Sequence, residues 1–154
     1  MDHLSDSTVD CRSVFIWLLL LLTPQIGYDD LALKRCSPAL DWTIHGWWPE
    51  INATQWPQYC NPNRFHEFNQ TIIKDIGPIL KRYWAPCKDW HIPDYKFWQH
   101  EWRKHGTCTN QTALRYFSST IAKFMALPTK YVDNCCGDGA QNCKIHFRGD
   151  RYWC

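Results

Sequence analysis

Cysteine is the residue that most constrains how this chain can fold. The chain has nine cysteines in 154 residues, and eight of them follow residue 27. An even number of cysteines behind a secretory leader is typical of a disulfide framework, which stabilises a small domain in an oxidising compartment. The sequence does not by itself determine how they pair. The eight are Cys36, Cys60, Cys87, Cys108, Cys135, Cys136, Cys143 and Cys154.

The N-terminus carries an apolar run at residues 14–22. This run is too short for a transmembrane helix, which needs roughly 20 apolar residues. It predicts a signal peptide over residues 1–27, followed by one domain over residues 28–154. We therefore expect a secreted or lysosomal protein without stable membrane association. Three N-glycosylation sequons agree with this route, and they begin at Asn52, Asn69 and Asn110.

The charge of the chain is mildly basic. It has 17 Lys+Arg against 15 Asp+Glu, for a formal net charge of +2. This balance is unlike a polycationic tail that binds nucleic acid through charge alone. Any contact with a polyanion must depend on where individual charges are placed.

The pattern of apolar residues predicts a mixed α+β fold. Short strands are expected at residues 31–33 and 42–45, where alternation puts Thr43 and His45 on one face. Residues 65–84 have helical spacing, and Gly77-Pro78 is expected to divide them into two helices. Further along, the sequence predicts helices over residues 94–105 and 112–127 and a small hairpin from residues 144–147 and 151–153.

The predicted helix ending at His105 carries a dense group of polar side chains. Glu101 and His105 are four residues apart, so they lie about 40° from each other around the axis. His100 and Lys104 form a second pair on an adjoining face. One helix end can therefore present a carboxylate, two imidazoles and an ammonium in one patch. Such groups are suited to proton transfer near neutral pH.

The pattern of this helix has two other interpretations. A zinc protease helix needs His-Glu-x-x-His, but His100 and His105 are five residues apart, or about 140° around the helix. That spacing argues against a shared metal ion. The purely structural alternative is that Phe97, Trp98 and Trp102 are core residues and that Glu101 and His105 form a surface pair.

A second group of residues argues against a purely structural role for this helix. Residues 42–49 have the sequence WTIHGWWP, in which His45 is followed at once by indole side chains. Indole faces stack well on nucleobases, at ~1–3 kcal/mol per base. An imidazole beside such faces suggests chemistry on a nucleic acid.

Residues 42–49 resemble the first active-site segment of the ribonuclease T2 family, and residues 100–108 resemble the second. The first segment differs at Trp47, where the family usually has Leu. Residues 56–60 and 83–84 also fit, so the resemblance covers residues 41–108 and extends to Leu127. It implies a central antiparallel sheet with clustered helices, stabilised by disulfides and shortened at both flanks relative to the family.

The resemblance also implies roles for individual side chains. His45 and His105 are similar to the two catalytic imidazoles of the family. One takes the proton of the ribose 2′-hydroxyl, the other protonates the departing 5′-oxygen, and a 2′,3′-cyclic phosphate forms. Glu101 and Lys104 are similar to the groups that stabilise the transition state in this family. This chemistry uses no metal or cofactor, because the nucleophile belongs to RNA itself.

Substrate contacts are implied in the same way. His100 and Lys104 are expected to bind phosphate, and Trp48 and Glu50 to hold a base, although Asp is common where Glu50 stands. DNA lacks the 2′-hydroxyl and should not react. We therefore expect a monomeric endoribonuclease for single-stranded RNA. The alternative is a secreted glycoprotein of the same fold that binds RNA or a receptor without catalysis.

The family resemblance implies two of the disulfides. Cys60 and Cys108 match the pair that ties the loop after the first segment to the end of the second. Cys143 and Cys154 resemble the C-terminal pair. The other cysteines, Cys36, Cys87, Cys135 and Cys136, have no pairing that the sequence implies.

Overall fold

The sheet of this protein has four antiparallel strands in the order β2-β1-β3-β4. A computed structural model describes residues 27–36, 41–137 and 140–154, so most of the predicted signal peptide lies outside the described residues. The sheet and the helices packed against it confirm the α+β class. The strands are β1 (Tyr28–Lys34), β2 (Thr43–Glu50), β3 (Asn142–Arg148) and β4 (Arg151–Trp153).

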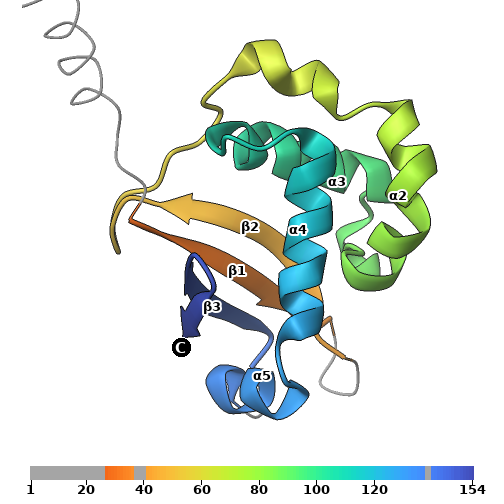
Figure 1. Ribbon diagram of the computed structural model, residues 1–154. Helices are drawn as coiled ribbons and strands as arrows, with labels where there is room; N and C mark the ends of the chain where they lie inside the picture. Colours follow the sequence, from red (N-terminus) through yellow and green to blue (C-terminus); the bar gives the residue numbers. More distant parts are fainter. Residues whose placement is uncertain (1–26, 37–40, 138–139) are drawn as a thin grey trace, which may run out of the picture.

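The helices lie between the two pairs of strands in the sequence. Figure 1 shows α2, α3 and α4 gathered at one side of the sheet, while α5 lies beside β3. No helix in the described part of the chain is long and apolar enough to cross a membrane. The α-helices are α2 (Gln70–Tyr83), α3 (Asp94–Lys104), α4 (Ala113–Ala126) and α5 (Thr129–Cys136), and the 3-10 turns are η1 (Pro62–Glu67), η2 (Lys88–Trp90) and η3 (Gly106–Cys108).

Most of the predicted elements are present. Helices α3 and α4 match the predictions for residues 94–105 and 112–127, and the Thr112 side chain caps α4 by accepting from the Arg115 N–H. The predicted C-terminal hairpin is β3 with β4. Helix α5 was not predicted, because its eight residues make only about two turns, too few to establish a helical period from the sequence.

The predicted break at Gly77-Pro78 is wrong. Helix α2 continues through Pro78, whose side chain is exposed. A proline inside a helix removes one hydrogen bond and costs about 3 kcal/mol. The helix tolerates this cost because Ile73, Ile76 and Leu80 pack against the core on both sides of the proline.

Buried aromatic side chains hold β2 against the helices. The Trp84 indole donates a hydrogen bond to the His45 carbonyl at 2.7 Å, and the Tyr116 hydroxyl donates to the Trp47 carbonyl at 2.9 Å. Both donors are fully buried. A buried hydrogen bond to a main-chain carbonyl fixes that carbonyl firmly, because leaving either group unpaired would cost about 1–3 kcal/mol. The segment around His45 therefore has a defined position relative to the helices.

Four disulfides complete the framework. Cys60 is bonded to Cys108, the pair that the family resemblance implies, and Cys36 to Cys87. The implied Cys143–Cys154 pair is wrong. The structure instead has Cys136–Cys143 and Cys135–Cys154.

The C-terminal pairing follows from the hairpin register. Trp153 pairs with His146, so Cys143 lies beyond the end of β4 and does not face Cys154. Cys135 and Cys136 lie side by side at the end of α5. Cys135 forms a disulfide with Cys154, and Cys136 forms one with Cys143. The unpredicted helix α5 is thus what made the sequence-based pairing fail.

Candidate active site

His45 occupies an irregularity in β2. Ala32 of β1 pairs with Gly46 and the next residue, Leu33, pairs with Ile44, so within these strands His45 has no partner on β1. This arrangement is a β-bulge, which can redirect a side chain beside a functional site. In a regular strand His45 and Trp48 would point to opposite faces. The bulge lets both side chains reach the same pocket.

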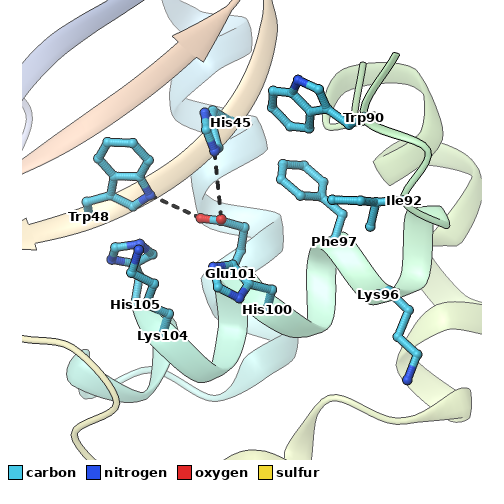
Figure 2. Close-up of a pocket in the computed structure, with 10 residues that line it drawn as sticks. All are labelled: His45, Trp48, Trp90, Ile92, Lys96, Phe97, His100, Glu101, Lys104 and His105. Carbon is cyan, nitrogen blue, oxygen red and sulfur yellow. Dashed lines mark hydrogen bonds and ion pairs between the residues drawn. The ribbon is translucent and has the colours of Figure 1, made fainter. Parts of the chain in front are cut away.

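The pocket lies between β2 and α3 and has a volume of about 400 Å³. Figure 2 shows His45 and Trp48 on the strand, facing Glu101 and His105 on the helix segment. A cavity of this size is adequate for a small ligand or for one nucleotide unit of a polymer. Its lining residues are His45, Trp48, Trp90, Ile92, Lys96, Phe97, His100, Glu101, Lys104 and His105.

Glu101 lies at the centre of this pocket and is only 1% exposed. Its Oε2 accepts a hydrogen bond from the Trp48 indole at 3.0 Å, and its Oε1 lies 4.0 Å from Nε2 of His45. A Cβ atom at Gly46 would collide with both Trp48 Nε1 and Glu101 Oε2. Glycine at position 46 is therefore required for the strand to approach the carboxyl group this closely.

His105 lies immediately after α3 and is 5% exposed. Its ring stacks on Trp48, with ring centroids 5.1 Å apart and an interplanar angle of 25°. No side chain or backbone group in the described part of the chain forms a hydrogen bond with its buried Nδ1. The stack on Trp48 therefore holds the imidazole in place.

Burial keeps the central groups uncharged near neutral pH. It raises the pKa of Glu101 to about 8, against lowering effects of the Trp48 hydrogen bond and the Lys104 charge. Burial lowers the pKa of His45 to about 4, with further lowering by Lys34, Lys104 and His100. It lowers the pKa of His105 to about 3, again reinforced by nearby cations. Near neutral pH the site thus holds a carboxylic acid between two neutral imidazoles.

This protonation state predicts how stability changes with pH. The pKa of Glu101 is raised on folding, so its contribution is complete below pH 4.5 and is lost as the pH rises toward 8. Glu101→Gln cannot ionise. The free energy of unfolding of this variant relative to the wild type should rise by about 1.4 kcal/mol per pH unit in that window. Urea unfolding between pH 5 and pH 8 measures the difference, and parallel curves for the two proteins would contradict the buried acid.

The remaining predicted site residues fall into two places. His100 and Lys104 line the same pocket as the imidazoles, so the structure brings them together with Glu101. Glu50 does not line that pocket. It is buried in a smaller neighbouring pocket of about 200 Å³, which shares Trp48, Lys104 and His105 with the first.

Several pocket residues were not recognised from the sequence. Trp90 and Phe97 contact the His45 ring, with centroids 5.3 and 5.7 Å away. Trp90 belongs to a short 3-10 turn, and Phe97 was assigned to no role beyond the helix core. An aromatic residue near a predicted active-site helix is a weak signal, because most such residues belong to the core.

The glycosylation sequons remain predictions. Asn52, Asn69 and Asn110 are all exposed, as an acceptor must be. Asn69 also caps α2, since its side-chain oxygen accepts from the Thr71 and Ile72 N–H groups. A glycan attached to its Nδ2 would leave that oxygen in place.

Comparison with known proteins places this site in a family. Residues 24–134 match the model of the ribonuclease T2 family. Ribonuclease Trv of Hypocrea rufa is 34% identical over 111 residues, which cover 60% of this chain and 46% of that protein. The chain therefore spans less than half the length of this curated relative.

Solved structures show the same fold. Actibind, a T2 ribonuclease, aligns with a TM-score of 0.63 at 21% identity, covering 83% of this chain and 80% of that one. RNase NT in complex with 5′-AMP aligns with a TM-score of 0.52 at 25% identity, covering 62% of this chain and 54% of that one. Since the family model matches most of the chain, including both segments that form the pocket, this protein belongs to the ribonuclease T2 family.

Proposed function

We propose that this protein is an endoribonuclease that cleaves single-stranded RNA without a metal ion, through a 2′,3′-cyclic phosphate. One observation carries the proposal: His45, Glu101 and His105 converge in one pocket from a strand and a helix far apart in the sequence. Two imidazoles on either side of a buried acid suit transfer of a phosphoryl group within RNA. Membership of the ribonuclease T2 family supports the same conclusion.

The two imidazoles divide the proton transfers. One neutral ring takes the proton of the ribose 2′-hydroxyl as its oxygen attacks the adjacent phosphorus. The other, in its protonated form, gives a proton to the 5′-oxygen as the bond from phosphorus to that oxygen breaks. Since burial lowers the pKa of both rings, the protonated partner is available chiefly at acidic pH. The charge of the bound phosphate favours that form.

Glu101 acts as a hydrogen-bond donor in this account. Its raised pKa keeps it a carboxylic acid at acidic and neutral pH, because burial disfavours the carboxylate. The Trp48 indole holds one oxygen of the group, which leaves the other facing His45 and the pocket. A buried neutral acid can donate to a non-bridging phosphate oxygen as negative charge develops there. The Lys104 ammonium adds positive charge to the same pocket.

Glu101→Gln and Glu101→Ala should separate donation from ionisation. Glutamine keeps a donor of the same length, whereas alanine removes it. We expect kcat/KM for RNA to fall by about 100-fold or more in Glu101→Ala and by about tenfold or less in Glu101→Gln, measured at pH 5. Equal losses in the two variants would show that the carboxylate is the working form and would overturn this role for the acid.

The cellular location and the substrate of this protein are part of the same proposal. We propose secretion or lysosomal delivery after removal of residues 1–27, which the four disulfides support, since such bonds persist in oxidising compartments. RNA is the proposed substrate, DNA should not react, and the domain over residues 28–154 is expected to act as a monomer. RNase NT, a protein of similar fold, was solved in complex with 5′-AMP, which supports a nucleotide as ligand.

A cleavage assay tests the proposal directly. The full chain, produced through a secretory pathway so that its disulfides form, is incubated with RNA in the presence of excess EDTA. Cleavage that persists in EDTA supports the proposal. Cleavage that requires a divalent cation would overturn it. A folded protein that binds RNA without cleaving it would favour the non-catalytic glycoprotein instead.

A further inference from the structure

The smaller pocket beside the active site contains a lysine that belongs to neither of the two active-site segments. We call this pocket the Glu50 pocket; its lining residues are Trp48, Glu50, Trp56, Lys104, His105 and Lys144. Because it shares Trp48, Lys104 and His105 with the first pocket, a base bound in it lies next to the reacting phosphate. The choice of base by this pocket rests on the proposed RNA cleavage.

Lys144 reaches this pocket from a part of the chain outside the family match. The match ends at residue 134, whereas Lys144 lies on β3. Lys144 of β3 pairs with Ala32 of β1, which is two residues from the buried Asp30. The cation thus reaches the pocket from the C-terminal strand β3, which lies beyond the residues that the family model matches.

Two buried carboxylates hold the Lys144 ammonium in place. Its Nζ lies 2.7 Å from Asp30 Oδ2 and 3.4 Å from Glu50 Oε1. Both acids are almost completely buried, and Asp30 also binds Nδ1 of His146 at 2.6 Å. Burial alone would lower the pKa of Lys144, but the two carboxylates outweigh it and raise the pKa. The ammonium therefore stays charged wherever the enzyme works.

The ammonium also has a donor left for a ligand. An ammonium carries three N–H groups, and the two carboxylates account for two of them. The Lys144 side chain is 47% exposed, and its Nζ lies 5.1 Å from the Trp48 ring centroid. A base stacked in this pocket meets a fixed cationic donor directly beside the acceptor oxygens of Glu50.

A donor beside an acceptor selects among the bases. Guanine presents acceptors at O6 and N7 and donors at N1 and the 2-amino group, so it can accept from a lysine and donate to a carboxylate along adjacent positions. Adenine carries an amino group where guanine has O6, and that donor would face the ammonium. Pyrimidines have one ring and less surface to stack on an indole.

We propose that Lys144 is a specificity-determining residue, which acts with Glu50 to favour guanine over adenine in the Glu50 pocket. The contact of its ammonium with O6 of guanine provides the discrimination. Asp30 is a positioning residue, because it binds the lysine and does not line the pocket. Loss of Lys144 should relax base choice, whereas loss of a general electrostatic contact would weaken all substrates alike.

Substrates with a single cleavage site test this proposal. DNA oligonucleotides carrying one ribonucleotide are prepared with guanine, hypoxanthine or adenine on either side of the scissile phosphate. Hypoxanthine keeps O6 and N1–H but lacks the 2-amino group, so it isolates the contact with Lys144. On one of the two sides, the wild type should cleave the guanine and hypoxanthine substrates about tenfold faster than the adenine substrate. Lys144→Met should reduce this ratio to about one, and Lys144→Arg should keep most of it.

Lys123→Met is the matched control. Lys123 is also a partly exposed lysine over aromatic rings, but it binds the Gly149 carbonyl and lines neither pocket. This variant should keep the wild-type ratio. An unchanged ratio in Lys144→Met, or a wild-type preference for adenine on both sides, would overturn the proposal while leaving RNA cleavage intact.

The two proposals fail in different ways. If the wild type cleaves none of the substrates, the proposed function fails, and base choice is then measured as equilibrium binding of 5′-GMP and 5′-AMP through indole fluorescence. Tighter binding of 5′-GMP that disappears in Lys144→Met supports the role of Lys144. Equal binding of the two nucleotides by the wild type contradicts it.

Discussion

Replacing His45 or His105 by alanine is expected to lower kcat/KM for RNA by about 10²–10⁴-fold. In the proposed mechanism each imidazole provides one of the two proton transfers, and both line the pocket around Glu101. The double variant should be little worse than either single variant, because the two groups act as one unit. Single-turnover cleavage of a fluorescent RNA measures all three proteins.

His66→Ala is the matched control for this prediction. His66 is an exposed histidine in η1 and lines neither pocket, so its loss should leave kcat/KM unchanged. Retention of activity within tenfold of the wild type in His45→Ala would rule out its role in proton transfer.

The wild-type pH profile should be bell-shaped with an optimum below pH 6.5, because burial lowers the pKa of both active-site imidazoles from that value.

Removing the Cys60–Cys108 disulfide is expected to give a large loss of stability. The bond joins residues 48 apart in the sequence, and closing a loop of that length stabilises the fold by about 4 kcal/mol. It also ties the loop after β2 to the end of α3, where the Tyr59 N–H donates to the Lys104 carbonyl at 2.8 Å. Cys60→Ala with Cys108→Ala should therefore lower both the midpoint of thermal unfolding and the affinity for RNA.

The Cys135–Cys154 disulfide provides the comparison. It closes a shorter loop, with a separation of 19 residues, and its loss should cost about 3 kcal/mol. It joins α5 to the end of β4, and neither cysteine lines the active-site pocket or the Glu50 pocket. At a temperature where both variants are folded, only the Cys60–Cys108 variant should show a raised KM. Equal KM values would mean that the bond stabilises the fold without shaping the site.

The parts of the site that depend on local spacing could be predicted from the sequence. Helical spacing alone puts Glu101 and His105 on the same side of α3, and both line the active-site pocket. The helix itself was predicted from Asp94 at its start and from Gly106 after its end. A Cβ at Gly106 would collide with the Trp102 ring, so close packing as well as the helix end requires glycine there.

The parts that depend on long-range packing could not be predicted. Alternation along a regular strand gives no sign of the bulge at His45, because the bulge arises from pairing with β1. The continuity of α2 through Pro78 depends on the core that its apolar face joins. The contact of Lys144 with Glu50 spans 94 residues, and nothing near either residue in the sequence indicates it.

The most direct measurement uses a DNA oligonucleotide that contains one ribonucleotide, incubated with the full chain in EDTA. Attack by the 2′-hydroxyl predicts a single cut, on the 3′ side of the ribonucleotide, with a 2′,3′-cyclic phosphate on the upstream fragment by mass spectrometry. A 2′-O-methyl nucleotide at the same position should abolish the cut. Cleavage of the all-deoxy or 2′-O-methyl oligonucleotide would contradict the proposed mechanism.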